Sequence, residues 1–338
     1  MRLLSVTQCR PGDVVADTIR QADGRVVLRH GVALTQDMLD SLARWQIGVV
    51  PIEWPGFETI DTETWFPVNL IAPMTNWVGQ GLKMLEGDGL VTARRLVKEL
   101  VEYEPRPRHR ALEFLSVYHG GNPGVVAWLN TVALVMKLAK ETAWKWVENY
   151  TLAAVLLGLT LPINAGTVGE PAPDHAHEMV ERLHAHSAVP STTIACLAQH
   201  HARWDGSGVP SLSSDEIYHG ALILGLAEQL TVLTFRTNEP AVPVHEALEW
   251  IIGGADIEFP LPLIQSLQRV FAPYPRGSVV TLGGGEVAVV LDNVTDWPTR
   301  PYIRLLNGSE AGRDVELKAP DQQTRVIMGF YEGRDWPA

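Results

Sequence analysis

The sequence predicts a mainly α protein, in which a helical bundle is flanked by a small N-terminal α+β module and a small C-terminal β module. Between residues 111 and 236, apolar residues recur mostly at helical spacing. Both ends of the chain instead carry short apolar stretches separated by glycine-containing turns. The chain has 338 residues, of which 46% are apolar and 20% are charged, so it has the composition of a globular protein of two or three domains.

Residues 1–52 are predicted to form the N-terminal module. Its helix is expected to begin after Thr35, whose hydroxyl can cap the first turn, and to continue through Leu42. Nothing in this module carries chemistry, so we expect it to serve packing or sensing. The expected strands are 14–19, 25–28 and 47–52.

Residues 53–110 are predicted to be a linker followed by a helix. The first part, 53–75, contains prolines and tryptophans without clear periodicity, whereas 76–103 acquires an apolar stripe and a charged face. The prolines of the basic run 104–110 would end the helix. This run is expected to be a solvated linker, with contact to a phosphate group as the alternative.

Residues 111–272 are predicted to be the helical domain, and residues 273–338 the C-terminal β module. The helix at 147–159 is apolar nearly all round and should therefore be central. Gly283-Gly284-Gly285 indicates a hairpin between two strands; no Lys-Ser/Thr follows it, which excludes a phosphate loop. The expected helices are 111–118, 125–142, 147–159, 175–186, 192–201, 218–235, 244–252 and 263–271, and the expected strands are 278–282, 286–291, 302–306, 314–317 and 325–328.

Charge and composition exclude several classes of protein. The net charge of −12 disfavours nucleic acid as a partner. The two cysteines are far apart, which indicates reduced, buried thiols and a cytoplasmic location. No apolar run is long enough for a membrane span or a signal peptide.

The most informative stretch is 199–210, where adjacent histidines at the end of a predicted helix precede a tight Asp-Gly-Ser-Gly loop. Adjacent side chains on a helix point about 100° apart, so His200 and His201 can serve one site only where the helix ends. Seven of the eleven histidines lie between His175 and His219. The histidines at 175, 177, 184 and 186 have no pair at a spacing of three or four residues, so we expect them to be mostly solvated surface residues.

This stretch resembles the signature of the HD-GYP family, which is a His-His pair followed by Asp-Gly-x-Gly-Tyr-Pro, with Val209 in place of the tyrosine. Pro11-Gly12 and the following glycines resemble a module that precedes such domains, and Tyr274 to Gly277 resembles the stretch that follows them. The resemblance covers most of the chain. It implies an HD-domain-like helical bundle and, in the family, hydrolysis of cyclic di-GMP with two or three metal ions, usually iron or manganese.

The resemblance also implies where the family's metal ligands should lie, and most of these positions carry no ligand. Only His200 and His201 are retained, while Glu228 supplies a carboxylate where the family has Asp. Together with His175 they are the residual candidates for at most one weakly bound divalent metal ion; the expectation is no cofactor. The positions that lack a ligand are Gly124, Trp128, Leu157, Gly158, Ala172 and Thr231.

These losses lead us to expect a non-catalytic signalling or regulatory protein. Leu, Gly and Trp cannot hold a pair of cations, without which no bound water is acidified. The loop could be a plain turn, but in the family it also contacts partners, including GGDEF-type domains. A protein partner in cyclic di-GMP signalling is therefore expected to bind there, at Arg203, Trp204, Asp205, Gly206, Ser207, Gly208, Val209 and Pro210.

Two alternatives remain open from the sequence. One is a residual metal-dependent phosphodiesterase or phosphohydrolase with a remodelled site. The other is binding of cyclic di-GMP without turnover, for which Trp128, Arg203 and Trp204 are candidate contacts. The oligomeric state stays open.

Overall fold

The computed structural model describes residues 1–21, 23–61, 63–104, 110–120, 122–161, 168–169, 174–184 and 189–336. The chain divides into two compact units. One comprises Met1–Trp65, Pro105–Gly121 and Gln268–Ala338, and the other comprises Phe66–Glu104 and Asn122–Leu267. The predicted N-terminal and C-terminal modules thus belong to one unit, and the helical segment before residue 105 belongs with the bundle. Helices dominate one unit and strands the other, so the chain is of mixed α and β composition.

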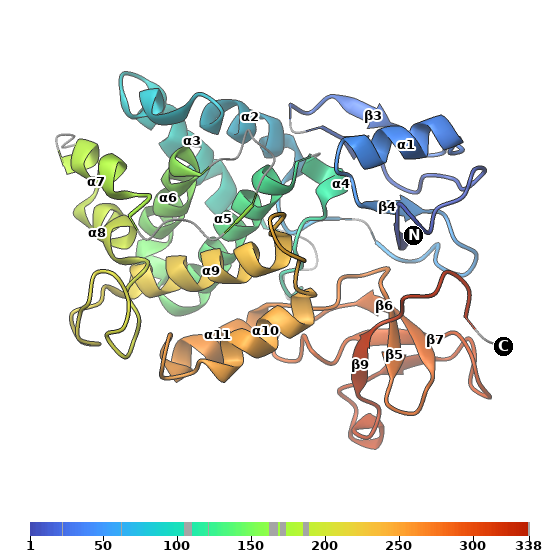
Figure 1. The fold of residues 1–338 in the computed structure, drawn as a ribbon. Coiled ribbons are helices and arrows are strands. Elements are labelled where there is room, and N and C mark those ends of the chain that lie inside the picture. Colours follow the sequence, from blue (N-terminus) through green and yellow to red (C-terminus); the bar gives the residue numbers. More distant parts are fainter. Residues whose placement is uncertain are drawn as a thin grey trace. The chain divides into compact units, whose positions relative to one another are not determined.

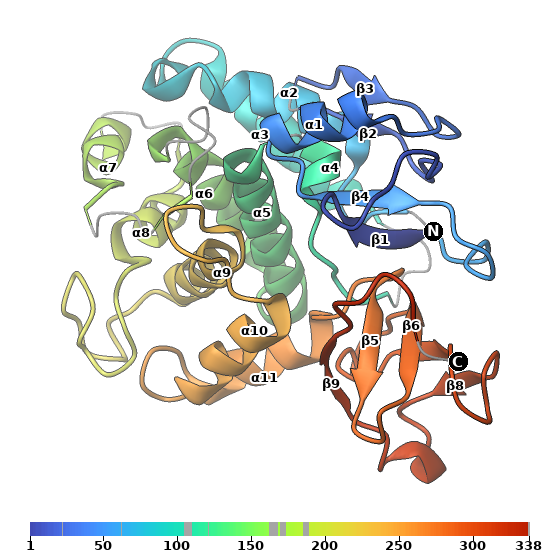
Figure 2. The ribbon, with the colours of Figure 1, turned by 45° about the vertical axis from the view of Figure 1, so that its right-hand side comes forward.

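The N-terminal part of the first unit contains one helix and two small antiparallel sheets (Figure 2). Thr35 Oγ1 accepts a hydrogen bond from the Met38 backbone N–H at 3.3 Å, which confirms the predicted cap. The strand expected at 14–19 is reduced to a two-residue strand and isolated bridges, and the strand beginning at Arg2 was not predicted. The elements are β1 (Arg2–Ser5), β2 (Ile19–Arg20), β3 (Val26–Leu28), α1 (Gln36–Arg44) and β4 (Val49–Ile52).

The C-terminal part of this unit is a five-stranded antiparallel sheet in the order β8-β7-β6-β5-β9. The predicted glycine hairpin is present: Gly285 takes φ 86° between β5 and β6. One face of the sheet is covered by a core that includes Val280, Val290 and Ile303. The bounds are β5 (Val279–Leu282), β6 (Val287–Asp292), β7 (Tyr302–Leu305), β8 (Asp314–Glu316), η5 (Pro320–Gln322) and β9 (Ile327–Phe330).

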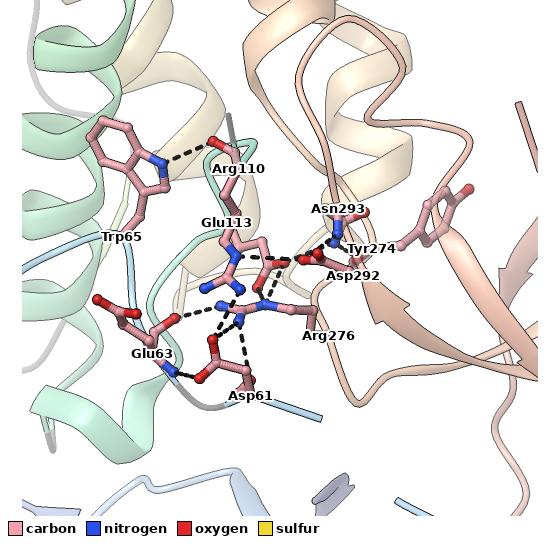
Figure 3. Close-up of polar contacts among 9 residues, drawn as sticks. All are labelled: Asp61, Glu63, Trp65, Arg110, Glu113, Tyr274, Arg276, Asp292 and Asn293. Atoms are coloured by element: carbon pink, nitrogen blue, oxygen red, sulfur yellow. Dashed lines mark hydrogen bonds and ion pairs between the residues drawn. The ribbon is translucent and has the colours of Figure 1, made fainter. Parts of the chain in front are cut away.

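Two buried arginines tie the three chain segments of this unit together (Figure 3). Arg110 Nη2 lies 2.9 Å from Asp61 Oδ2, and Arg276 Nε donates to Glu113 Oε1 at 3.0 Å. Asn293 Nδ2 also donates to Glu113 Oε1, at 2.8 Å. Arginines that are almost fully buried need such carboxylate partners to offset their lost hydration.

The structure around Arg110 corrects two predictions. Arg110, expected in a solvated basic run, is buried among carboxylates; the rest of that run, 105–109, lies outside the described residues. The helix expected at 111–118 is replaced by bridges at Arg110 and Leu112, followed by the short helix α4 (Val117–Gly120). The backbone there pairs with Val294 and Phe271 instead of with itself.

In the second unit, helices surround α5 and α6, and α9 packs along α5 (Figure 1). As predicted, α6 is buried along most of its length. Helix α2 occupies part of the expected linker, and α11 crosses the boundary between the two units. The bounds are α2 (Val68–Val78), η1 (Gly81–Leu85), α3 (Gly89–Glu102), α5 (Pro123–Thr142), η2 (Trp144–Trp146), α6 (Val147–Leu157), η3 (Gly158–Thr160), α7 (His177–His184), α8 (Ser191–Gln199), α9 (His219–Phe235), α10 (Val244–Gly253) and α11 (Leu261–Val270).

Residues 162–167 and 170–173, and the last residues of the helix expected at 175–186, lie outside the described residues. Both cysteines are free and buried, as predicted. In the part of the chain that the structure describes, every helix is too short or too polar to cross a membrane.

Candidate functional site

The helical unit gathers three histidines and one glutamate into a single cluster. His175 lies in the turn before α7, His200 and His201 lie at the end of α8, and Glu228 lies in the middle of α9. One potential ligand atom from each of these four residues falls within 4.8 Å of all the others. The four residual candidates from the sequence are thus brought together, and we call them the histidine–glutamate cluster.

Most of the ligand atoms in this cluster are within 4 Å of one another. The Nε2 atoms of His175 and His200 are 2.9 Å apart. Glu228 Oε1 lies 3.6 Å from His175 Nε2, and Glu228 Oε2 lies 3.5 Å from His200 Nε2 and 3.7 Å from His201 Nε2. All four side chains therefore point to one common centre.

Adjacent histidines converge here because α8 ends directly before them. Helix α8 ends at Gln199, and the rings of His200 and His201 lie 4.2 Å apart between centroids. Gly225 allows this end of α8 to approach α9, since a Cβ on Gly225 would lie 2.0 Å from the His200 carbonyl oxygen. A larger residue at 225 would therefore push the histidines away from Glu228.

Burial controls the charge of the cluster. The side chains of His175, His200 and Glu228 are no more than 8% exposed, and that of His201 is 15% exposed. Burial lowers the pKa of His175 and His201 to about 4, and it lowers the pKa of His200 well below its usual range. Burial also raises the pKa of the Glu228 carboxyl group to about 8. Without a cation, the cluster at pH 7 thus consists of neutral imidazoles and a protonated carboxyl group.

The hydrogen bonds behind the rings fix which nitrogens face the centre. Thr160 Oγ1 lies 2.8 Å both from the Leu157 carbonyl oxygen and from His175 Nδ1, so it is hydrogen-bonded to the ring nitrogen that faces away from the centre. His200 Nδ1 donates to the Leu197 carbonyl at 2.8 Å. When both Nδ1 atoms carry the protons, the two Nε2 lone pairs face each other across 2.9 Å, an arrangement that a cation between them would stabilise.

The donor set fits one metal ion. Imidazole nitrogen and carboxylate oxygen suit Zn²⁺ and divalent iron or manganese, and ligand atoms of one four-coordinate ion lie roughly 3.3–3.6 Å apart. Separations of 2.9–3.7 Å bracket this range. His201 Nε2 and Glu228 Oε1 are buried without a hydrogen-bond partner, as expected of atoms that need a cation.

The positions that lack a ligand are filled by packing. The indole of Trp128 is fully buried, and its Nε1 donates to the Ala154 carbonyl at 3.0 Å. A Cβ on Gly158 would lie 2.4 Å from that Nε1, so the small residue makes room for the large one. Gly124 and Leu157 are also buried, Thr231 shares a hydrogen bond with Thr131 at 2.7 Å, and Ala172 lies outside the described residues.

The loop of residues 203–210 is anchored on both sides. The backbone N–H groups of Trp204 and Asp205 donate to the carbonyls of Glu258 and Ile257 at 3.0 and 2.9 Å. Gly206 takes φ 83°, and a Cβ on Gly208 would lie 2.2 Å from the His201 carbonyl oxygen. The glycines are thus required for a loop that folds back onto the histidine pair.

The anchored loop presents a mixed surface to solvent. Asp205 is exposed, and a hydrogen bond from Ser207 holds the pKa of its carboxyl below the usual range. Val209 is 54% exposed, and Ile257, on the segment that pairs with the loop, is also 54% exposed. The loop and its partner segment thus expose two apolar side chains beside a carboxylate.

A cavity of about 240 Å³ reaches the two adjacent histidines from the side of α7 and Pro210. Pockets for ligands of drug size usually measure about 300–1,000 Å³, so this one suits water or a small anion better than a cyclic dinucleotide. The predicted nucleotide contacts are not gathered there: Trp128 is fully buried, and Arg203 donates to the His200 carbonyl at 3.3 Å.

The sequence named all four cluster residues as candidate metal ligands, although for His175 it favoured a solvated surface position. His175 was expected to be mostly a surface residue, yet its side chain is 8% exposed within the cluster; His177, in contrast, is 71% exposed. The role of Thr160 in orienting His175 had no signal in the sequence. Gly225 did have a signal in the sequence, because an isolated glycine inside an apolar helix often marks the close approach of another segment of backbone.

No protein-family model matches the chain, and no curated protein does. Among solved structures, the chain is similar to one described as Bd1817, a HDG"Y"P protein from Bdellovibrio bacteriovorus. The identity is 16% and the TM-score 0.41, over 78% of this chain and 97% of that one.

Proposed function

We propose that this protein is a non-catalytic regulatory protein of HD-GYP-like architecture, whose helical unit is stabilised by one divalent metal ion on His175, His200, His201 and Glu228. The observation that carries the proposal is the convergence of these four ligand atoms within 4.8 Å of one another. The metal would orient the end of α8 and, through it, the loop of residues 203–210.

The number of ligands supports a structural role for the ion over a catalytic one. Structural zinc sites use four protein ligands, whereas catalytic sites keep a position open for water or substrate. The histidine–glutamate cluster supplies four ligands, and three of their side chains are no more than 8% exposed. A bound ion would thus supply charge neutralisation and cross-linking between α8, α9 and the turn before α7.

The loop supports a binding role. It begins two residues after the histidine pair, and the Val209 backbone N–H donates to the His201 carbonyl at 3.0 Å. Loss of the ion would free His201 and remove one support of this contact. We propose that the loop is the surface for a protein partner in cyclic di-GMP signalling, and that the metal maintains its shape.

One observation favours a second candidate, a residual metal-dependent phosphohydrolase. The cavity of about 240 Å³ gives His200 and His201 access to a small polar molecule. If one of the four ligands left the ion, water would take its place and become more acidic. Hydrolysis would then depend on both the metal and the cavity.

A hydrolysis assay with metal-loaded protein separates these candidates. The protein is loaded with Mn²⁺, Fe²⁺ or Zn²⁺ and incubated with cyclic di-GMP and with a small phosphomonoester. The proposal expects no turnover above that of His200→Ala protein. Turnover that is lost in this variant would replace the regulatory function with the second candidate, and calorimetry with cyclic di-GMP tests binding without turnover.

A further inference from the structure

A second, larger pocket in the helical unit is lined by aromatic and acidic side chains. Its volume is about 770 Å³, within the range of ligand-binding pockets, and it shares no residue with the histidine–glutamate cluster. We call it the tryptophan pocket and define it by Trp144, Trp146, Tyr150, Asp215, Glu216 and Tyr218. These residues come from η2, from α6 and from the segment that leads into α9.

The inner wall of the tryptophan pocket is fixed by packing. The rings of Tyr150 and Tyr218 meet edge to face with their centroids 5.7 Å apart. A Cβ on Gly220 would lie 2.6 Å from the Tyr150 ring, so the lack of a side chain at this position makes room for the ring. The Tyr218 backbone N–H donates to Gln199 Oε1 at 2.7 Å, and this hydrogen bond joins two residues that line the pocket.

The outer rim is apolar and open to solvent. Trp144 is 63% exposed and Trp146 is 37% exposed, although both have large apolar rings. Exposed tryptophans beside a preformed pocket are typical of residues that dominate the binding energy of an interface. An open rim encloses a small molecule poorly, but it allows an extended segment to pass across it.

The charges around the rim favour a cation. Hydrogen bonds from Ser213 hold the pKa of both Asp215 and Glu216 below the usual range, and both carboxylates are exposed. Among the described residues that line the pocket, Lys145 is the one lysine or arginine, and its ammonium lies 4.9 Å from the centre of the Trp146 ring. An ammonium of the chain itself thus already lies at this ring, which shows that the ring accepts a cation, and the two carboxylates would repel a phosphate.

We propose that the tryptophan pocket binds a basic segment of a partner protein, with an arginine side chain lying against the indoles of Trp144 and Trp146 and its guanidinium facing Asp215 and Glu216. Arginine suits both the indole rings and the carboxylates of the pocket, because its planar guanidinium group stacks on aromatic rings and pairs with carboxylates. The net charge of −12 adds long-range attraction for such a segment. This inference goes beyond the proposed function, since it concerns another surface and does not require a metal ion.

Fluorescence polarisation with short labelled peptides tests the proposal on the full chain. One peptide contains glycine, serine and two arginines, and its control carries citrulline in place of both arginines. The arginine peptide should bind about tenfold more tightly. Trp144→Ala should weaken its binding about three- to fivefold, and Asp215→Asn combined with Glu216→Gln should weaken it and reduce its salt dependence.

Matched controls keep the test independent of folding and of the metal. Trp250→Ala removes an indole that is 62% exposed and does not line the pocket, so binding should not change. Protein treated with chelator should bind as untreated protein does, which separates this result from the fate of the metal proposal. Equal binding of the arginine and citrulline peptides, no effect of either pocket variant, or no binding at up to about 1 mM peptide would overturn the proposal. Equal affinity for free arginine amide would show that the pocket takes a small molecule instead of a protein segment.

Discussion

The indole of Trp128 occupies the space that a side chain at Gly158 would need, with its Nε1 2.4 Å from the position of a Cβ there. The resemblance to HD-GYP domains places a metal-ligating histidine at the first position and an aspartate at the second. Here one residue is large and apolar, the other has no side chain, and the two fit each other. Trp128 and Gly158 are thus packed as core, and the proposed metal site rests on the histidine–glutamate cluster alone.

We expect that Trp128→His will not create a second metal site. The substitution removes a fully buried indole and its hydrogen bond to the Ala154 carbonyl, so it should destabilise the helical unit by about 3 kcal/mol or more. Urea unfolding measures the loss, and elemental analysis should still find the metal content of the parent protein. A second equivalent of metal in this variant would show that the packing around Gly158 is not what excludes it.

Gly225→Ala should weaken metal binding without touching a ligand. Its Cβ would lie 2.0 Å from the His200 carbonyl oxygen, so α8 and α9 must move apart and separate His200 from Glu228. Competition with a chromophoric chelator measures the affinity. Gly253→Ala is the control, because nothing lies within 4 Å of a Cβ at that glycine. Equal loss of affinity in both variants would argue against the close approach as the cause.

Thr160→Val should also lower the metal affinity, since the hydrogen bond between Thr160 Oγ1 and His175 Nδ1 orients the His175 ring. Loss of such a supporting contact typically costs about 10–100-fold in affinity. Thr234→Val is a matched control on α9, where the hydroxyl donates to the Leu230 carbonyl of its own helix and lies outside the cluster. An unchanged affinity for the Thr160 variant would mean that His175 needs no such support or is not a ligand.

The metal-free protein should be most stable near pH 6.5. In the folded protein the pKa values of His175 and His201 are lowered to about 4, so between pH 4 and 6.5 the unfolded chain binds more protons than the folded protein. The free energy of unfolding therefore rises with pH in this range. The raised pKa of Glu228, about 8, has the opposite effect, and stability should fall by up to about 2 kcal/mol between pH 6.5 and 8.

Chemical denaturation across this pH range, with chelator present, measures the profile. Glu228→Gln should remove the decline above pH 6.5, because the amide has no proton to lose. Saturating metal should remove it as well, since a cation then takes the place of the proton on Glu228. A decline of the same size in the Gln variant would show that another group causes it.

Much of the helical unit was predictable because its helices have strong apolar periodicity and clear ends. The stretch 125–142 corresponds to α5 within two residues, and the glycine hairpin near Gly285 was placed correctly. The helix expected at 111–118 was wrong because long-range pairing of Leu112 with Phe271 outweighs local propensity, and such pairing leaves no local signal.

The candidate site was predictable in part. His200, His201 and Glu228 follow from the motif and its resemblance, whereas the burial of His175 depends on how the turn before α7 packs. The histidine spacing there, which has no pair at three or four residues, argues against a site within α7 but does not bear on a site shared with α8 and α9. The fit of Trp128 to Gly158 is a relationship between two helices and has no counterpart in local sequence.

The central claim is that the helical unit holds one metal ion on four protein ligands. Native mass spectrometry of protein purified without chelator, compared with its Glu228→Gln variant, tests this claim most directly. The account predicts one divalent ion per chain and a large loss of that ion in the variant. Two or more ions per chain, or no ion in the parent protein after exposure to Zn²⁺, Fe²⁺ and Mn²⁺, would contradict it.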